Sequence, residues 1–341
     1  MRKIVGLVLV GLGVALLGLA IALPSYVYPR IAKAPANPDQ LIEAQGSGIT
    51  VLLAQDENDG GIRVLENQDV TVTRKVTGEI RPDATKADGD NAFYRLAFQT
   101  QVAQQRNGLL SAYVEGGSFS GKTGLANNCC GDYLATTPTD PQGEPIRHEG
   151  LLFKFPFETE KKNYPFWDVN VKKSATAKYD GTETIKGLET YRFVQPITDV
   201  VIAQVEVPGS LMQLPDQAAV KADRVYSTVR TLWVEPRSGA IIKGSETVNQ
   251  RLVYNGKQAP LIQGTITYTD KTVQTNVDKY AEAASGLRFV KQIGPIGGWV
   301  LGLILLLVGL ALVLLSSRKP ATWKDEEDDE GKVSAAHKQK I

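Results

Sequence analysis

Two long uncharged stretches constrain this chain more than any other feature of its sequence. The first covers residues 4–23 and the second residues 296–315, near opposite ends of a chain of 341 residues. An α-helix of about 20 residues is long enough to cross the hydrocarbon core of a bilayer, which is about 30 Å thick. We therefore predict two transmembrane helices with most of the chain between them.

Basic residues indicate how these helices are oriented. Arg2 and Lys3 precede the first stretch, and Arg318 and Lys319 follow the second. Because Lys and Arg are enriched on the cytoplasmic side of membrane helices, both termini are predicted to be cytoplasmic. A cleaved signal peptide is the alternative for the first stretch, but its length favours an uncleaved anchor.

This topology divides the chain into five parts. They are a cytoplasmic N-terminus at 1–3, a transmembrane helix at 4–23, an extracytoplasmic domain at 24–295, a second transmembrane helix at 296–315 and a charged cytoplasmic tail at 316–341. The predicted location is the plasma membrane. A formal net charge of +1 gives no indication of a nucleic-acid partner.

Small residues recur at helical spacing in both predicted spans. Such stripes allow two helices to approach closely in lipid, where van der Waals packing drives association. The sequence therefore predicts contact between the two helices, or between copies in a homo-oligomer. The residues of the stripes are Gly11, Ala15, Gly18 and Ala22 in the first span, and Gly298, Gly302 and Gly309 in the second.

Between the spans, apolar and polar residues alternate with a period of two. The alternation is clear over residues 62–80, 151–158 and 262–269, and β-branched residues dominate residues 200–207 and 224–234. Period-two patterns of this kind are typical of half-buried strands. We predict a mainly β (α+β) exported domain with antiparallel sheets or a barrel-like closure, flanked by the two transmembrane helices.

One amphipathic helix is predicted near the membrane. Apolar residues recur with a period near 3.6 over residues 275–293, directly before the second span. This position indicates a stalk or a lid.

The sequence offers little catalytic chemistry. Its two histidines, His148 and His337, fall in different predicted compartments, so we predict no metal site and no cofactor. Asp132, Glu149 and Asp168 surround His148 in the sequence, and paired carboxylates can act as acid and base on sugars. An enzyme acting on envelope glycan or lipid is therefore an alternative, although the balance favours a protein that is not an enzyme.

Aromatic residues cluster in one segment of the exported domain. Such residues can form an ordinary β-sheet core, or they can line a groove for a lipid or glycan. The candidate groove residues are Phe153, Phe155, Phe157, Tyr164, Phe166 and Trp167.

Cys129 and Cys130 are adjacent and are the only cysteines of the chain. Export would place them in an oxidising compartment, where thiols pair. Adjacent Cα atoms are about 3.8 Å apart, closer than in relaxed disulfides, so a bridge would form a tight turn. We predict this vicinal disulfide; two free or buried thiols, pairing between chains and redox activity remain alternatives.

Three features together resemble a known family. They are the two terminal spans, the Cys-Cys-Gly turn at residues 129–131, and the segments GLLFKFPFETEKKNYPFWD at 150–168 and TLWVEPRSGAII at 231–242. They resemble the actinobacterial membrane proteins of the porin PorA family. The resemblance implies residence in the plasma membrane of a high-GC Gram-positive bacterium, and related proteins are linked to assembly of lipoglycan or mycolate envelope layers.

From these features we predict a non-enzymatic cell-envelope protein. Its exported domain would bind or scaffold lipid or lipid-linked glycan, with membrane lipids and envelope-synthesis or transport proteins as partners. A pore is the remaining alternative. It is disfavoured at this point because a barrel in lipid needs an outward apolar band, whereas this chain has two strongly apolar helices.

Overall fold

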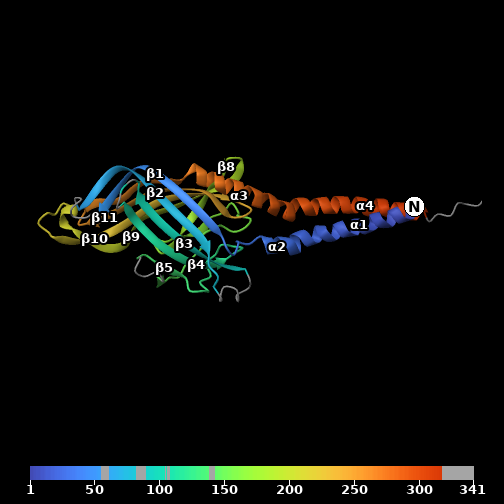
Figure 1. Cartoon of the computed structure of the whole chain (residues 1–341), viewed down its shortest axis with the longest axis horizontal. Helices are drawn as coiled ribbons and strands as arrows, with labels where there is room; N and C mark the ends of the chain where they lie inside the picture. The colour runs from blue at the N-terminus through green and yellow to red at the C-terminus, as the bar shows by residue number, and fades with distance from the viewer. Residues whose placement is uncertain (55–60, 82–89, 104, 106–107, 138–142, 317–341) are drawn as a thin grey trace, which may run out of the picture. The chain divides into compact units, whose positions relative to one another are not determined.

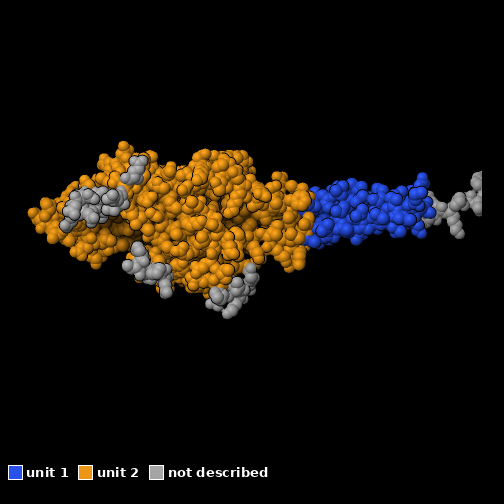
Figure 2. Space-filling model, in the orientation of Figure 1, with its two compact units in different colours: residues 1–22, 294–341 blue, residues 23–293 orange. Residues whose placement is uncertain are grey.

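A computed structural model describes residues 1–54, 61–81, 90–103, 105, 108–137 and 143–316 of the chain. The chain forms two compact units, which Figure 2 colours separately. The first unit comprises residues 1–22 and 294–341, and the second comprises residues 23–293. Beyond Ser316, the charged tail predicted for residues 316–341 lies outside the described residues.

The second unit consists mainly of long strands, so we call it the β domain. Its strands are β1 Asp39–Ala54, β2 Ile62–Gly78, β3 Asn91–Val102, β4 Leu109–Ser120, β5 Tyr133–Ala135, β6 Glu144–Pro145, β7 Tyr164–Asp168, β8 Lys173–Ile185, β9 Leu188–Pro208, β10 Ala219–Glu235, β11 Ala240–Tyr254 and β12 Lys257–Tyr268. Its helical segments are η1 Leu23–Val27, α2 Tyr28–Ile31, η3 Gly209–Met212, α3 Asp270–Arg288 and η4 Phe289–Ile293.

These strands form one antiparallel sheet (Figure 1). The order of its 12 strands is β6-β5-β4-β3-β2-β1-β12-β11-β10-β9-β8-β7. Each strand therefore pairs with a neighbour in the chain, except where the first long strand meets the last: there Ala44 of β1 lies opposite Tyr268 of β12. The predicted fold class, a mainly β domain with antiparallel pairing beside two apolar helices, is confirmed.

Within the described residues, strand pairing does not close this sheet into a ring. Isolated bridges instead connect β7 to the far part of β4: Leu151 pairs with Phe166 and with Leu125, and Phe119 of β4 pairs with Ala126. The linking backbone bonds are short, with Leu151 N donating to Pro165 O at 2.7 Å. The segment between β6 and β7 thus spans the gap that the strands leave.

The predicted strand over residues 151–158 is wrong. No named strand covers these residues, and only Leu151 makes bridges to neighbouring backbone. Phe153 and Glu158 adopt positive φ values of 65° and 54°, and Pro156 has no N–H to donate. The alternation of phenylalanines comes from an irregular segment that turns one side chain after another toward the interior.

The two faces of the sheet differ in character. On β2, Val72, Arg74 and Val76 face internal cavities. On the opposite face, exposed polar side chains pair across β11 and β12: Thr247 Oγ1 lies 2.9 Å from Thr265 Oγ1, and Gln263 donates to Asn249 at 3.0 Å. Cross-strand polar pairs of this kind suit a face in water.

Helix α3 packs against the sheet through its apolar face. Thr269 precedes its first residue and caps the first turn, because its side chain accepts a hydrogen bond from Thr272 N. Val273 and Val277 are buried against Trp233 and Ile242. The helix predicted over 275–293 therefore starts earlier, at Asp270, and forms part of the wall of the domain.

The first unit contains helices α1 Arg2–Ala22 and α4 Gly294–Ser316, which are both apolar and long enough to cross a membrane. They pack on each other through glycines. A Cβ atom added at Gly13 would lie 2.8 Å from Gly302 O, and one added at Gly6 would lie 2.9 Å from Gly309 O. Close backbone contact thus depends on the missing side chains.

The small residues of α1 that contact α4 are not the predicted ones. Gly298, Gly302 and Gly309 of α4 all lie close to α1. On α1, however, the buried small residues are Gly6, Gly13 and Ala20. The predicted Gly11, Ala15 and Gly18 are exposed and Ala22 is half-buried, because the seven-residue spacing that faces α4 lies on another side of the helix.

The glycine contact predicts a difference between two matched substitutions. Gly13→Ile should force the helices apart and destabilise their pairing by about 1 to 3 kcal/mol, as overpacking does. Gly297→Ile, in α4, should have a much smaller effect, because nothing lies within 4 Å of the added Cβ atom. Thermal melting of helical circular dichroism in detergent-solubilised full-length protein measures this, and equal melting temperatures for the two variants would contradict the packing.

Candidate functional site

The concave side of the sheet encloses two cavities. The larger has a volume of about 510 Å³ and the smaller about 280 Å³. They adjoin, because they share part of their walls. The shared residues are Arg74, Tyr113, Val169, Arg230, Leu232 and Tyr268. We call these two cavities together the lumen.

Arg230 of β10 occupies the shared wall and connects several strands. Its guanidinium donates to Asp168 at 2.8 Å, to Gln195 at 2.9 Å and to Glu246 at 3.4 Å. The Asp168 side chain is fully buried and also accepts a hydrogen bond from Tyr226. A buried charge costs several kcal/mol unless it is paired, so these contacts make the arginine tolerable inside the domain.

Arg74 of β2 completes this cluster from the other side of the lumen. It lies 3.8 Å from Glu246, and its guanidinium carbon is 5.4 Å from the centre of the Phe98 ring. Burial alone would raise the pKa of Glu246, but Arg230 and Arg74 outweigh it and lower that pKa. The carboxylate is therefore ionised, and this negative charge in the smaller cavity lies beside the two arginines of the shared wall.

The predicted aromatic groove is divided between the core and the lumen. Phe155 and Tyr164 are buried in a cluster with Phe193, where Phe155 stacks on Phe193 at 4.6 Å between ring centres. The other predicted residues line the larger cavity. They are Phe153, Phe157, Phe166 and Trp167.

A buried histidine lies beside the larger cavity. Nδ1 of His148 lies 2.7 Å from Asp132, and Nε2 lies 3.2 Å from Glu115. Glu115 also accepts a hydrogen bond of 2.7 Å from Trp167 Nε1, and it lines the cavity. Burial would lower the pKa of His148, but the bonds to Asp132 and Glu115 outweigh burial and raise the pKa to about 9. The imidazolium therefore donates to both carboxylates at neutral pH.

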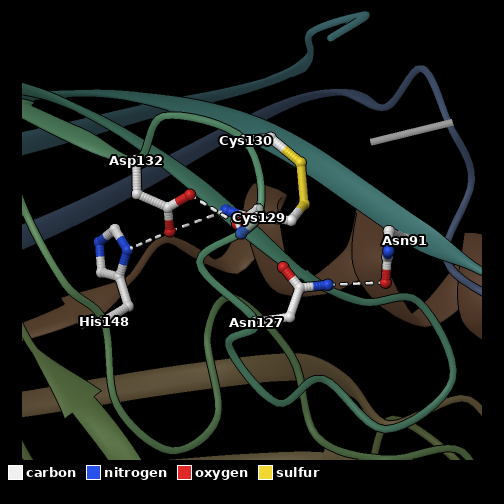
Figure 3. The surroundings of a disulfide bond; sticks show 7 residues. Asn91, Asn127, Cys129, Cys130, Asp132 and His148 are labelled. Carbon is white, nitrogen blue, oxygen red and sulfur yellow. Dashed lines mark hydrogen bonds and ion pairs between the residues drawn. A yellow bond between two sulfur atoms is a disulfide. The ribbon is translucent and has the colours of Figure 1, made fainter. Parts of the chain in front are cut away.

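The cysteine turn lies close to this histidine: Figure 3 shows the disulfide together with the contact between Asp132 and His148. Cys129 and Cys130 form a disulfide, with Cα atoms 3.7 Å apart. Asn128, at a φ of 51°, accepts from His148 N at 2.7 Å and donates to His148 O at 3.0 Å. Cys130 packs on Phe93, and Cys129 N donates to Ser118 Oγ. The turn thus holds the His148 backbone in place.

The structure brings together only part of the predicted acid–base set. Asp132 contacts His148, whereas Asp168 belongs to the Arg230 cluster and Glu149 is exposed. Sequence reasoning missed Glu115, although its charge on a strand otherwise rich in small and apolar residues was a signal. Among the described residues, no group of three His, Cys, Asp or Glu side chains could hold a metal ion.

The arrangement around His148 is unsuited to nucleophilic catalysis. Ser118 Oγ donates to Asp132 at 2.5 Å, and both ring nitrogens of His148 face carboxylates. In a hydrolytic triad, the histidine must instead accept the proton of the serine. The cluster is better described as an ion pair that fixes the loop beside the cavity.

The raised pKa of His148 predicts how stability depends on pH. A pKa raised from 6.5 to about 9 on folding gives stabilisation that is complete below pH 6.5 and is lost as the pH rises through about 9. The full loss is at most about 3 kcal/mol, since one pKa unit is about 1.4 kcal/mol. Urea unfolding followed by tryptophan fluorescence at pH 6 and at about pH 10 should show a change in the free energy of unfolding that is less favourable in the wild type than in His148→Gln, because other titrating groups such as Lys154 act on both proteins alike. An equal change in the two proteins would contradict it.

The same network predicts that Asp132 contributes more to stability than the disulfide does. Asp132→Ala leaves a buried imidazolium without its closer partner, which costs about 3 to 5 kcal/mol. A bridge between adjacent residues closes almost no loop, so Cys129→Ala with Cys130→Ala should cost much less. Urea unfolding of the two variants at pH 7 compares them, and a larger loss in the double alanine variant would overturn this ranking.

Two curated relatives resemble the chain along its sequence. One, from Corynebacterium resistens and named Porin PorA, is 24% identical, with the alignment covering 93% of this chain and 98% of the relative. Another Porin PorA, from Corynebacterium amycolatum, is 22% identical over 53% of this chain and 56% of its own length.

A porin-like protein of known structure from Bacteroides uniformis is 13% identical. It covers 70% of this chain and 98% of its own, but its TM-score of 0.18 is too low to support an argument.

These relatives correct the main functional prediction made from the sequence. The prediction of a non-enzymatic scaffold that binds lipid or lipid-linked glycan during envelope assembly is wrong, because a relative matched over nearly its whole length is named a porin. Lipid binding and a role in envelope assembly have no support from the relatives either.

The predicted resemblance to a family is confirmed. The sequence profile described as Porin PorA matches residues 5–311, which is most of the chain and includes the whole β domain and most of both apolar helices. The chain is therefore a membrane protein that belongs to the Porin PorA family.

Proposed function

We propose that this chain is a pore-forming membrane protein whose solute passes through the lumen of the β domain. The observation that carries the proposal is the hollow interior: two adjoining cavities that share a wall containing Arg74 and Arg230. Most domains of this size fill their interior with apolar side chains at high density. The family name of the relatives supports the same function.

The charged wall between the cavities is suited to be the constriction of such a passage. Rings of charged side chains select solutes in many channels. Arg74 and Arg230 reach Glu246 from opposite sides of the lumen, at 3.8 Å and 3.4 Å. A solute that moves from one cavity to the other must pass these three side chains.

The pore differs from an outer-membrane barrel in what faces lipid. A lipid-embedded barrel carries an outward apolar band. Here the outward side of β11 and β12 carries the exposed Thr247–Thr265 and Asn249–Gln263 pairs. We therefore assign the β domain to water and the membrane crossing to α1 and α4.

The helices suggest how a path could cross the bilayer. Both spans lack charged residues, and one pair of tightly packed helices leaves no room between its members. Gly11 and Gly18 lie on a face of α1 with nothing within 4 Å, where a second copy could approach. We extend the proposal to a homo-oligomer in which helix pairs from several copies surround the path.

The proposed topology places both termini in the cytoplasm and the β domain outside the plasma membrane. Arg2 and Lys3 at the start of α1 support it through the enrichment of basic residues on the cytoplasmic side. The disulfide supports it too, because such bonds persist in oxidising compartments.

Conductance in planar bilayers tests the pore. Purified full-length protein should give discrete current steps, and a silent preparation that is folded by circular dichroism would contradict the proposal.

Adjacent exposed residues of β4 provide a matched pair, since Ser111 lines the smaller cavity and Ala112 does not. A thiol-reactive methanethiosulfonate should reduce the conductance of Ser111→Cys and leave Ala112→Cys unchanged. An equal response of both variants would exclude a path through the lumen.

A further inference from the structure

Basic side chains outnumber acidic ones among the described residues that line the lumen. Among the described residues, only two acidic ones line it, Glu115 in the larger cavity and Glu246 in the smaller. The basic residues that line it are Lys33, Arg74, Lys154, Arg224, Arg230 and Lys279. Both acidic residues are already occupied, because Glu115 bonds to His148 and Glu246 lies next to Arg74 and Arg230.

Lys154 is a buried basic residue that has no acidic partner in the described part of the chain. Its Nζ atom is inaccessible to solvent and has no hydrogen-bond partner among the described residues. The Nζ atom lies 4.0 Å from the centre of the Phe157 ring. Burial lowers the pKa of Lys154 to about 7. A buried ammonium in this state gains most from an anionic ligand.

Arg224, which lines the smaller cavity, is a second basic residue without an acidic partner in the described part of the chain. Its guanidinium donates twice to the neutral amide of Gln250, at 2.6 Å and 3.1 Å, and to no carboxylate in the described part of the chain. Two further buried donors, Nε of Arg74 and Nε of Arg230, have no recorded partner within the described residues. Both arginines belong to the wall that the two cavities share.

The entrance to the larger cavity has the same sign of charge. Lys33 and Lys279 line this cavity and are exposed to solvent. Basic side chains at the rim of a cleft concentrate anions near it and raise their rate of entry. Exposed lysines outside and unpaired cations inside thus favour the same class of solute.

We propose that the lumen binds small anions bearing a carboxylate or a tetrahedral oxyanion, with Lys154 in the larger cavity and Arg224 in the smaller as their main contacts. Carboxylates and tetrahedral oxyanions are both hydrogen-bond acceptors that suit ammonium and guanidinium donors. Selection of anions during transport is a consequence that rests on the proposed pore function; binding itself does not.

Competitive acetylation of lysines tests binding directly. Full-length protein in detergent is treated with an acetyl succinimidyl ester at pH 7.5, with and without sodium sulfate, and each lysine is quantified by peptide mass spectrometry. Exposed Lys178 of β8, which does not line the lumen, is the internal control. A bound anion blocks Lys154 and favours its charged form, so sulfate should slow the acetylation of Lys154 several-fold relative to Lys178.

Two results of this experiment would overturn the proposal. One is an equal effect of sulfate on Lys154 and Lys178, which would show a general salt effect. The other is a failure of Lys154 to react at all without sulfate, which would show that the lumen is closed to small solutes.

A matched pair of variants gives a second readout of binding. Sulfate should raise the thermal unfolding temperature of the wild type and of Lys178→Met, and raise that of Lys154→Met by less than half as much. The two variants lose the same charge, so a nonspecific effect of net charge would act on both. Equal shifts in Lys154→Met and the wild type would remove Lys154 from the site.

Reversal potentials in a potassium chloride gradient separate this inference from the pore proposal. Chloride preference that decreases in Lys154→Met and not in Lys178→Met would support both. Sulfate protection without any conductance would keep the anion site and reject the pore. Conductance without sulfate protection would keep the pore and reject the anion site.

Discussion

The pairing of buried arginines with buried carboxylates is the interaction on which the β domain depends. Arg230 of β10 bonds to Asp168, the last residue of β7, to Gln195 of β9 and to Glu246 of β11. Arg74 approaches the same Glu246 from β2. Charged groups fixed in the middle of the domain cannot be covered by apolar side chains without a large penalty. A hollow interior is therefore a consequence of where these charges lie.

The buried charges also explain why the two units differ in composition and packing. Because the β domain has polar groups on its outer face and inside its lumen, its stability comes from local clusters and hydrogen-bonded pairs. The helices α1 and α4 have the opposite composition, and glycine contacts replace hydrophobic burial as the source of their pairing. A pore built from these parts separates the solute-contacting domain from the lipid-contacting helices.

Much of the fold could be predicted from the sequence, because length and period are strong local signals. The two uncharged stretches correspond to α1 and α4, and the period-two runs correspond to β2 and β12. The spacing of apolar or small residues could be predicted from the sequence, but the face of the helix that contacts its neighbour could not. Two stripes of small residues exist on α1, and nothing local shows that Gly6 and Gly13 face α4 while Gly11 does not. The prediction of a strand at residues 151–158 failed because an irregular segment can also bury several apolar residues, among them the consecutive Leu151 and Leu152.

The lumen was harder to predict, although one signal was present. Arg74 follows Val70 and Val72 at a position of β2 where the pattern expects an apolar residue, and Glu246 interrupts β11 in the same way. Charges at inward positions of a strand indicate either a polar network or a cavity. Their association could not be predicted, because Arg74, Arg230 and Glu246 come together only through the order and register of the strands. The same is true of Glu115, Asp132 and His148.

The central claim is that the interior of the β domain is an open passage. A cryo-electron microscopy structure of the full chain in lipid nanodiscs tests it most directly. The account predicts a continuous solvent-filled path past Arg74, Arg230 and Glu246, and helix pairs from more than one copy around a path through the bilayer. A single copy in the membrane with side chains filling the space between the two cavities would contradict it.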